Sequence, residues 1–238
     1  MDTEQLNQIF FDLSPFDLVG SLQKLCELMP NQKKSFSTSL SLEDQIITHV
    51  IFTQQLPIEV FTLETGRLFP ETLQLIDITE SRYGQKINRY YPNKNAVEAY
   101  IHQHGLNGFY DSVENRKRCC HIRKVSPLNH ALQGVDIWLT GLRHEQSTFR
   151  ENLPLFENDD EHQLVKFNPL LDWTLNQVKT FIDQHQIPYN PLHNLGYPSI
   201  GCEPCTRAIK PGENVRAGRW WWENEEVWNQ ECGLHVHK

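Results

Sequence analysis

Four cysteines arranged as two distant pairs place the strongest constraint on how this chain folds. Cys119 and Cys120 are adjacent, and Cys202 and Cys205 form a CxxC motif about eighty residues further along. Four thiolates are the ligand set of a structural zinc ion and also of an iron–sulfur cluster. If the four share one metal centre, the fold must bring two remote segments together.

The spacing within each pair bears on which metal is bound. Structural zinc sites generally take two ligands from a turn such as CxxC, because two ligands of one small ion need a loop between them. Adjacent cysteines reach a single zinc ion only with strain, whereas a cubane cluster offers them separate iron atoms. The sequence therefore favours an iron–sulfur cluster, leaves zinc as an alternative, and leaves purely structural thiols as a third.

The composition is that of an ordinary globular protein. With 238 residues, of which 39% are hydrophobic and 22% charged, the chain is long enough to bury one sizeable core. No apolar run approaches the roughly 20 residues of a membrane-spanning helix, and the acidic amino end is unlike a secretion signal. We therefore expect a cytoplasmic protein without a membrane partner. In that compartment six cysteines indicate metal binding or catalysis rather than disulfides.

The distribution of charge argues against nucleic acid as a partner and for a small anion. The formal net charge is −8, which repels nucleic acid over most of the surface. Basic residues nevertheless flank both cysteine pairs: Arg116, Lys117, Arg118, Arg123 and Lys124 around the first, and Arg207, Lys210, Arg216 and Arg219 after the second. Each cluster is consistent with a plain solvated face. Their coincidence with the cysteines favours an anionic ligand near the metal.

Short apolar runs that alternate with helical patterns predict a layered α/β fold with a mainly parallel sheet flanked by helices. We expect strands at residues 34–38, 58–63, 86–90 and 135–140, and helices at 42–54, 70–83, 95–104 and 174–185. Residues 157–162 are expected to form a charged surface loop. Prolines and glycines after residue 187 predict an irregular extension. The whole chain is expected to be one domain: a helical segment to about residue 30, an α/β core over 31–186 and the extension over 187–238.

Two loops that follow strands have residues suited to binding an anion. Ser37, Thr38 and Ser39 precede a helix, whose free amide groups and dipole favour a phosphate or sulfate. The same residue types are also ordinary helix caps. The second strand leads to Gly66, which permits close backbone approach, and to Arg67, which is equally consistent with a surface charge. Ligands of open α/β sheets bind at the carboxyl ends of the strands.

A further cysteine, Cys232, lies in the ending ECGLH. Glu231 and other nearby acidic residues disfavour its thiolate, so the thiol is a poor nucleophile in isolation. If the tail closes over Lys124, Arg216 and Arg219, these cations lower the pKa of the thiol and activate it. The alternative is an incidental cysteine in an exposed tail.

Several segments together resemble the assimilatory adenylyl-sulfate reductases, which are relatives of the phosphoadenylyl-sulfate reductases. They are RCCHIRKVSPL at 118–128, the stretch from IPYNPLH to RWWWE at 187–223, and ECGLH at 231–235. SFSTSLSLED at 35–44 and LETGRLFPET at 63–72 resemble the phosphate loop and the following strand and turn of that family. The resemblance runs from about residue 34 to the end. It departs from the family pattern at Glu64, where the usual LDTG segment has aspartate.

The resemblance implies a Rossmann-related, adenine nucleotide α-hydrolase-like fold and one [4Fe–4S] cluster on Cys119, Cys120, Cys202 and Cys205. It implies reduction of adenosine 5′-phosphosulfate to sulfite and AMP, for sulfate assimilation and cysteine biosynthesis. Cys232 would be the nucleophile, pass through an S-sulfocysteine, and be regenerated by reduced thioredoxin or glutaredoxin. Substrate contacts are implied for Ser37, Thr38, Ser39, Leu63, Thr65, Gly66, Arg67, Arg123, Lys124, Arg216, Arg219 and His235.

Three alternative functions stay open. The first is a reductase of the 3′-phosphorylated nucleotide, or of both nucleotides. The second is an ATP-dependent adenylating or thiolating enzyme, which is disfavoured because SFSTSLS lacks the glycine pair of an SGGxDS loop. The third is a zinc-held binding module that recruits a partner through Trp220, Trp221, Trp222 and the tail. A homo-oligomer is compatible with the sequence, although no motif indicates one.

Overall fold

The computed structural model describes residues 2–11, 17–147 and 150–223. The chain divides into two compact units, each described here by itself. The first comprises Met1–Thr62, Gln74–Asn88 and Leu132–Asn190, and the second comprises Leu63–Leu73, Arg89–Ala131 and Pro191–Lys238. The organisation as one domain, with boundaries near residues 30 and 186, stays a prediction.

A six-stranded sheet forms the centre of the first unit, and its order is β3-β2-β1-β4-β6-β5. The strands are β1 (Lys34–Ser37), β2 (Glu59–Leu63), β3 (Asn88–Tyr90), β4 (Ile137–Leu139), β5 (Phe156–Asp159) and β6 (Leu164–Phe167). Strand β1 pairs in parallel with β2 and β4, and β4 pairs in parallel with β6. The predicted α/β class with a mainly parallel sheet is confirmed, and β2 and β3 lead into the second unit.

Strand β5 corrects one prediction, because it occupies much of the segment expected to be a surface loop. It pairs antiparallel with β6, and Glu157 forms an ion pair of 2.7 Å with its partner Lys166. Phe156 is buried and stacks on Phe167, with ring centroids 4.3 Å apart. Strand β5 was not predicted because its sequence is highly charged. Its polar side chains pair with those of the neighbouring strand, and its apolar contacts come from other segments.

The helices of the first unit are α1 (Thr3–Phe11), α2 (Leu18–Leu28), α3 (Leu42–Thr53), most of α4 (Pro70–Tyr83) and α8 (Leu175–His185). Helices α3, α4 and α8 begin within one residue of the predicted positions, and the predicted amino-terminal helical segment consists of two helices, α1 and α2. Side chains of Asp17, Ser41 and Thr174 cap three of these helices by accepting a hydrogen bond from the backbone N–H three residues on. Helix α3 is buried along almost its whole length, so the loop before it is held by the core.

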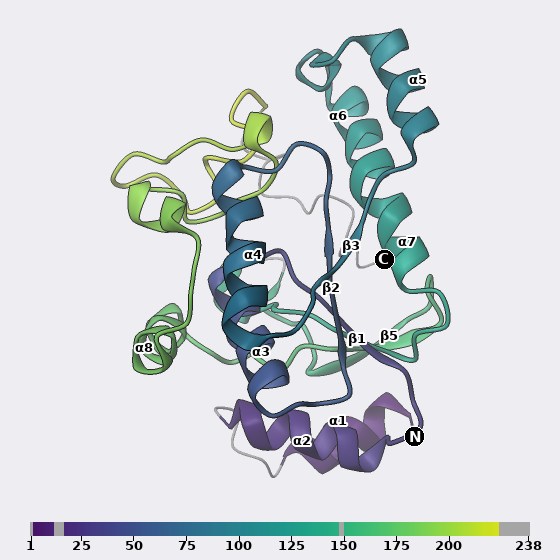
Figure 1. Ribbon diagram of the computed structural model, residues 1–238, viewed down its shortest axis with the longest axis vertical. Helices are drawn as coiled ribbons and strands as arrows, with labels where there is room; N and C mark the ends of the chain where they lie inside the picture. The colour runs from purple at the N-terminus through teal and green to yellow at the C-terminus, as the bar shows by residue number, and fades with distance from the viewer. Residues whose placement is uncertain (1, 12–16, 148–149, 224–238) are drawn as a thin grey trace. The chain divides into compact units, whose positions relative to one another are not determined.

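In the second unit, α6 (Val113–Cys120), a π-helical segment (His121–Val125) and α7 (Ser126–Ala131) follow one another in the chain as one helical rod (Figure 1). Helix α5 (Lys94–His104) precedes it. Helix α5 was predicted from the sequence. No structure was predicted for residues 113–131, because that stretch is strongly basic and its apolar residues do not recur at helical spacing. The extension after Pro191 contains two short 3₁₀ turns, Pro191–Leu195 and Glu203–Cys205, which confirms its irregular character.

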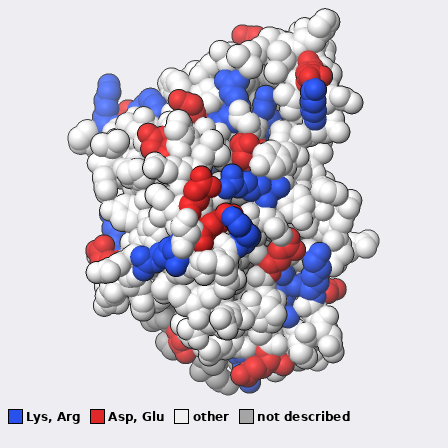
Figure 2. Space-filling view, in the orientation of Figure 1, with Lys and Arg blue, Asp and Glu red and all other residues white. Residues whose placement is uncertain are grey.

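The surface carries both signs of charge. On the face shown in Figure 2, basic and acidic side chains are interspersed. The formal net charge of the whole chain is −8. Among the described residues, no helix combines the length and the apolar character needed to cross a membrane.

A buried ion pair in the first unit generates a stability prediction. Arg143 Nη2 lies 2.8 Å from Glu43 Oε1, and both side chains are less than a tenth exposed. Removing one partner of a buried pair leaves an uncompensated charge, so Glu43→Ala should lower the free energy of unfolding by about 3–5 kcal/mol in urea denaturation. The control is Glu98→Ala, which removes the exposed pair with Lys94 and should cost less than about 1 kcal/mol. Equal losses in both variants would contradict the role of burial.

Candidate functional site

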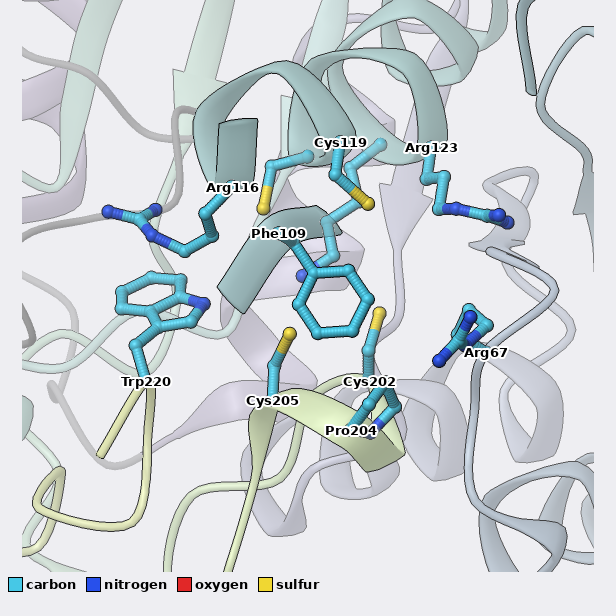
Figure 3. A pocket seen from close by; sticks show the side chains of 11 residues that line it. Arg67, Phe109, Arg116, Cys119, Arg123, Cys202, Pro204, Cys205 and Trp220 are labelled. Carbon is cyan, nitrogen blue, oxygen red and sulfur yellow. The ribbon is translucent and has the colours of Figure 1, made fainter. Parts of the chain in front are cut away.

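A pocket in the second unit brings all four cysteines of the two distant pairs together (Figure 3). It is lined by Arg67, Phe109, Arg116, Cys119, Cys120, Arg123, Lys124, Cys202, Pro204, Cys205 and Trp220. The sulfur of Cys119 comes from the helical side of the pocket, and the sulfurs of Cys202 and Cys205 approach from the opposite side. The pocket is partly open to solvent.

The first cysteine pair is positioned by a helix that changes its winding at the site. Ser112 caps α6 by accepting a hydrogen bond from the N–H of Asn115, and the helix ends with Cys119 and Cys120. The π-helical segment follows directly and carries Arg123 and Lys124 into the same pocket. Such π segments are rare and frequently occur at functional sites.

The second pair lies on a short turn. The N–H of Cys205 donates to the carbonyl of Cys202 at 3.0 Å, which closes the CxxC turn. Cys202 also forms an isolated antiparallel bridge with Leu68, and the N–H of Glu203 donates to the Arg67 carbonyl at 2.8 Å. The CxxC segment is therefore fixed to the turn that follows β2.

That turn contacts both cysteine segments. Thr65 Oγ1 lies 3.3 Å from the sulfur of Cys202, and the Thr65 carbonyl accepts a hydrogen bond of 2.6 Å from Arg123 Nη1. Gly66 has a φ of +73°, and a Cβ at this position would lie 3.2 Å from the same Arg123 nitrogen. Leu63 begins this stretch at the end of β2. The backbone conformation and the close approach both require glycine at position 66.

Arg67 extends from the same turn along the pocket wall. Its guanidinium donates to the Leu106 carbonyl at 3.2 Å and to Asn107 Oδ1 at 2.8 Å. Its central carbon lies 5.4 Å from the centroid of the Phe109 ring, a cation–π contact. Phe109 was not singled out in the sequence, because a single aromatic residue in an irregular stretch carries no local signal.

Burial raises the pKa of two pocket thiols, Cys119 and Cys205. It raises the pKa of Cys205 to about 12, with a further increase from the neighbouring Cys202, while Lys124 acts in the opposite direction. Burial also raises the pKa of Cys119, and Arg123 opposes that increase. Thiolates bind metal, so metal binding here must displace protons, and the adjacent cations favour that exchange.

The donor set is of a kind that binds metal. Four thiols line one pocket beside the cations Arg123 and Lys124. Four thiolates are the ligand set of a structural zinc ion and of an iron–sulfur cluster, so the residues present fit a metal–thiolate centre.

The tryptophan run anchors the extension within the second unit. Trp220 is 1% exposed and packs in a cluster with Phe109, Cys202 and Cys205. The Arg116 guanidinium lies 4.2 Å from the centroid of the Trp220 ring, and Arg116 Nε donates to Glu223 at 2.7 Å. Trp220 is therefore a buried anchor of the extension rather than an exposed docking residue.

Arg216 and Arg219, which the resemblance implies as substrate contacts, are not among the residues that line the pocket. Arg219 is 7% exposed, donates to Ser199 Oγ at 3.2 Å and lies 5.2 Å from the Trp220 ring. Its charge lowers the pKa of Cys205, although less than burial raises it. The backbone N–H of Arg216 donates to Asn214. Cys232 and His235 lie outside the described residues.

The predicted phosphate loop belongs to the first unit. Ser37 ends β1, and its hydroxyl accepts a hydrogen bond of 2.8 Å from Trp138 Nε1. Thr38 Oγ1 accepts a hydrogen bond of 3.0 Å from the N–H of Leu40, whose φ of +62° is unusual for a residue other than glycine. The backbone N–H and the hydroxyl of Ser39 both donate to Asp44 Oδ2, at 2.6 and 2.7 Å.

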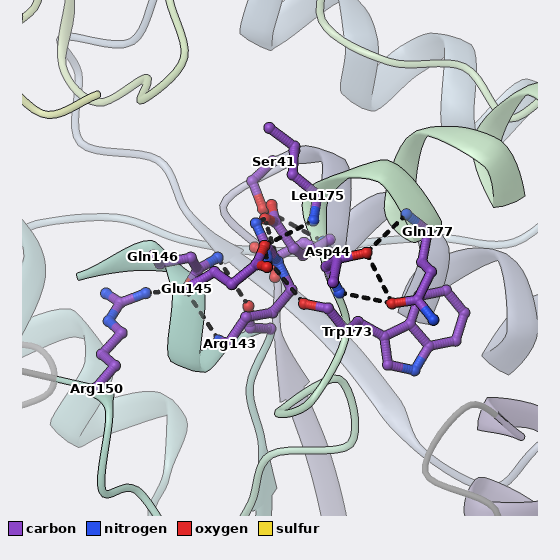
Figure 4. Close-up of polar contacts among 12 residues, drawn as sticks. Ser41, Asp44, Arg143, Glu145, Gln146, Arg150, Trp173, Leu175 and Gln177 are labelled. Atoms are coloured by element: carbon purple, nitrogen blue, oxygen red, sulfur yellow. Dashed lines mark hydrogen bonds and ion pairs between the residues drawn. The ribbon is translucent and has the colours of Figure 1, made fainter. Parts of the chain in front are cut away.

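Sequence reasoning missed the charged residues around this loop, which Figure 4 shows. Arg143, after β4, donates to Glu43 and to the Trp173 carbonyl at 2.9 Å each. Burial alone would raise the pKa of Glu43, but Arg143 and hydrogen bonds hold it below its usual value. Glu43 and Asp44 stood in the quoted SFSTSLSLED segment without a role. A basic residue after one strand and acidic residues after another were the available signal.

Comparison with known proteins agrees with this site. Residues 33–208 match the model of the phosphoadenosine phosphosulfate reductase domain. The chain belongs to the phosphoadenosine phosphosulfate reductase family. Adenosine 5′-phosphosulfate reductase of Agrobacterium fabrum is 54% identical over 94% of this chain and 85% of its own length. The enzyme of that name from Allochromatium vinosum is 56% identical over 84% of this chain and 77% of its own length.

Solved structures show the fold of the family. Phosphoadenylyl-sulfate reductase from Candida auris, in a phosphate complex, matches 88% of this chain and 98% of its own, with a TM-score of 0.71 and 27% identity. Candida glabrata FMN adenylyltransferase matches 95% of this chain and 84% of its own with a TM-score of 0.54 and 16% identity, a likeness of fold alone. The predicted Rossmann-related fold is confirmed.

The turn at Gly66 generates a second prediction. Gly66→Ala should destabilise the protein for two reasons. Alanine is strained at positive φ by about 1–2 kcal/mol, and its Cβ would crowd the Arg123 side chain. Gly84→Ala is a matched control, since Gly84 has a φ of +64° with nothing within 4 Å of an added Cβ. Urea unfolding should show a loss at position 66 that exceeds the control by about 1 kcal/mol. Indistinguishable losses would refute the Arg123 contact.

Proposed function

We propose that this protein reduces adenosine 5′-phosphosulfate to sulfite and AMP in sulfate assimilation and cysteine biosynthesis. The observation that carries the proposal is the pocket where Cys119, Cys120, Cys202 and Cys205 meet beside basic side chains. The choice of the nucleotide without a 3′-phosphate rests on the relatives named adenosine 5′-phosphosulfate reductase, which are 54–56% identical to this chain. The reductase of the 3′-phosphorylated nucleotide is the second candidate.

The four pocket cysteines would hold one [4Fe–4S] cluster. The facing thiols and the adjacent Arg123 and Lys124 support this assignment. When bound, the cluster would organise the pocket and contribute to its electrostatic field. We assign it no part in electron transfer, because thiol exchange already accounts for both electrons of the reduction.

The proposed substrate contacts are those that the family resemblance indicates. The start of α3, with Ser37, Thr38 and Ser39, would bind the phosphate portion through amide and hydroxyl donors. The turn at Leu63, Thr65, Gly66 and Arg67 would contact the nucleoside side. The cations Arg123, Lys124, Arg216 and Arg219, with His235, would surround the phosphosulfate. Positive charge there stabilises the negative charge that moves onto the departing phosphate.

The chemistry would proceed through a covalent intermediate on Cys232. Its thiolate attacks the sulfate sulfur, the bond from sulfur to the bridging oxygen breaks, and AMP leaves with the electron pair. The product is an enzyme S-sulfocysteine. A thiolate of reduced thioredoxin or glutaredoxin then attacks Cys232 Sγ and expels sulfite. The second thiol of that donor resolves the mixed disulfide, so the donor dithiol supplies two electrons. We place the reaction in the cytoplasm, where such donors are kept reduced.

The deciding experiment is anaerobic purification followed by a sulfite assay with reduced thioredoxin. Adenosine 5′-phosphosulfate and its 3′-phosphorylated form are compared as substrates. We expect a brown protein that absorbs at about 400 nm, as iron–sulfur proteins do. It should have a higher kcat/KM for adenosine 5′-phosphosulfate than for the 3′-phosphorylated form. A colourless protein with one tightly bound zinc and no sulfite production would instead establish a zinc-held binding module.

Replacement of the proposed nucleophile gives a third prediction. Cys232→Ser should retain the visible absorption and nucleotide binding but form no sulfite, because a serine hydroxyl cannot form the S-sulfo intermediate. Cys26→Ser is the matched control, since Cys26 belongs to α2 and to no proposed site. Sulfite production by Cys232→Ser at the parental rate would overturn the mechanism.

Lys124 gives a fourth prediction. Lys124→Ala should keep the fold and lower kcat/KM about 100-fold, because a preorganised positive charge is lost from the pocket. Lys117→Ala removes an equal charge from the exposed side of α6 and should stay near the parental value. The comparison by steady-state sulfite assay separates a local effect from a change in net charge. Unaltered kcat/KM in Lys124→Ala would remove Lys124 from the mechanism.

A further inference from the structure

The loop that should bind the substrate's phosphate already holds an anion of the protein itself. Asp44, in the first turn of α3, reaches back to the loop and accepts two hydrogen bonds on one oxygen, from the N–H and the hydroxyl of Ser39. These are the kinds of donor that a phosphate or sulfate uses at the start of a helix. Ser41, the cap of α3, accepts from the N–H of Asp44 at 3.3 Å.

The carboxylate is enclosed from the other side as well. Asp44 is 5% exposed, and a Cβ on Gly141, after β4, would overlap its second oxygen. The neighbouring cation does not neutralise it, because Arg143 is bonded to Glu43, Glu145 and the Trp173 carbonyl. Hydrogen bonds from Ser39 and the Ser41 side chain are thus the contacts that stabilise this negative charge.

Binding of an anion at the same donors has an electrostatic consequence. An ionised carboxylate at hydrogen-bond distance from Ser39 would repel a phosphosulfate group bound there, and the repulsion is strong where water is excluded. A protonated carboxyl would not repel it. A protonated carboxyl also has an O–H that can donate a hydrogen bond, while its other oxygen can still accept one.

We propose that Asp44 occupies the donors of the phosphate loop in the ligand-free protein and takes up one proton from solvent when the phosphosulfate binds. Asp44 is then a positioning residue that changes from a competing anion to a hydrogen-bond donor, and no other bond is made or broken. This inference rests on the proposed function and assigns the protonation state of its binding loop.

The ionisation of Asp44 supports this direction. Burial raises its pKa to about 6, in spite of the hydrogen bonds from Ser39, so the proton is available at little cost near neutral pH. The nearby charged groups are Glu43 on the same helix, which raises this pKa further, and Arg143 and Glu145 on the segment after β4. His144 on that segment is paired with Asp172 at 3.2 Å and is the group to separate experimentally.

The test compares binding at several pH values with and without the carboxylate. Adenosine 5′-phosphosulfate binding is measured by calorimetry between about pH 6 and pH 8.5 on the cluster-loaded Cys232→Ser protein, which does not turn over. We expect Kd to rise about tenfold per pH unit above the pKa of Asp44. In two buffers of different ionisation enthalpy, close to one proton should be taken up per nucleotide at pH 7.5.

Asp44→Asn in the same background keeps the shape of the side chain and removes its charge. We expect a Kd that varies less than about twofold over this pH range and no proton uptake. Asp183→Asn, on the exposed side of α8, is the control and should retain the full pH dependence. A pH dependence that survives in Asp44→Asn would assign the proton to His144 or another group and overturn the proposal.

The outcomes distinguish this inference from the function beneath it. A pH-independent Kd without proton uptake in Cys232→Ser shows that Asp44 does not change its protonation state on binding and refutes the inference, whether or not Asp44→Asn folds. Wild-type protein that forms no sulfite from either nucleotide refutes the proposed function. Sulfite formation by wild-type protein together with absent proton uptake refutes the Asp44 inference alone.

Discussion

Burial of four cysteines in one pocket is the constraint on which the second unit depends. Thiols at such a place are held protonated, as the pKa of about 12 for Cys205 shows, and become metal ligands by losing protons. The second unit supplies positive charge, which favours the loss of these protons. Arg123 and Lys124 enter the pocket from the π-helical segment, and the turn at Thr65 contacts the sulfur of Cys202 and the Arg123 guanidinium. Three features bring these groups together: the π-helical winding, the glycine at position 66 and the buried Trp220.

Sequence reasoning succeeded where the determining signal is local. Strands β1, β2 and β4 and helix α4 follow from apolar runs and turn residues, and the cysteine pairs follow from their spacing. It failed for β5, for residues 113–131 and for the Glu43–Arg143 pair. In each case a stabilising contact is remote in sequence: Phe10 of α1 packs on Phe156 of the edge strand, the pocket residues pack on the basic helix, and the partner of Glu43 is one hundred positions away. A local pattern does not encode such partners.

The two adjacent acids of α3 show how burial gives one residue type two behaviours. Glu43 has Arg143 beside it, and its pKa lies below the usual value. Asp44, one residue later, has hydroxyl and amide donors in place of a cation, and its pKa lies near 6. Desolvation acts on both, so the cation decides the difference. The first carboxylate is a fixed part of the core, whereas the second can respond to a neighbouring anion.

The fold alone would not have led to a reductase. A reductase and an FMN adenylyltransferase share it with this chain, so function must be argued from the site. Two local features set the site apart. The loop after β1 turns through Leu40 at positive φ rather than through a glycine pair, and it is filled by the Asp44 carboxylate. This loop differs from the glycine-rich loops that bind the polyphosphate of ATP, and it carries hydroxyl and amide donors bonded to a carboxylate. The second unit adds a pocket lined by four thiols, a feature that phosphate transfer does not need.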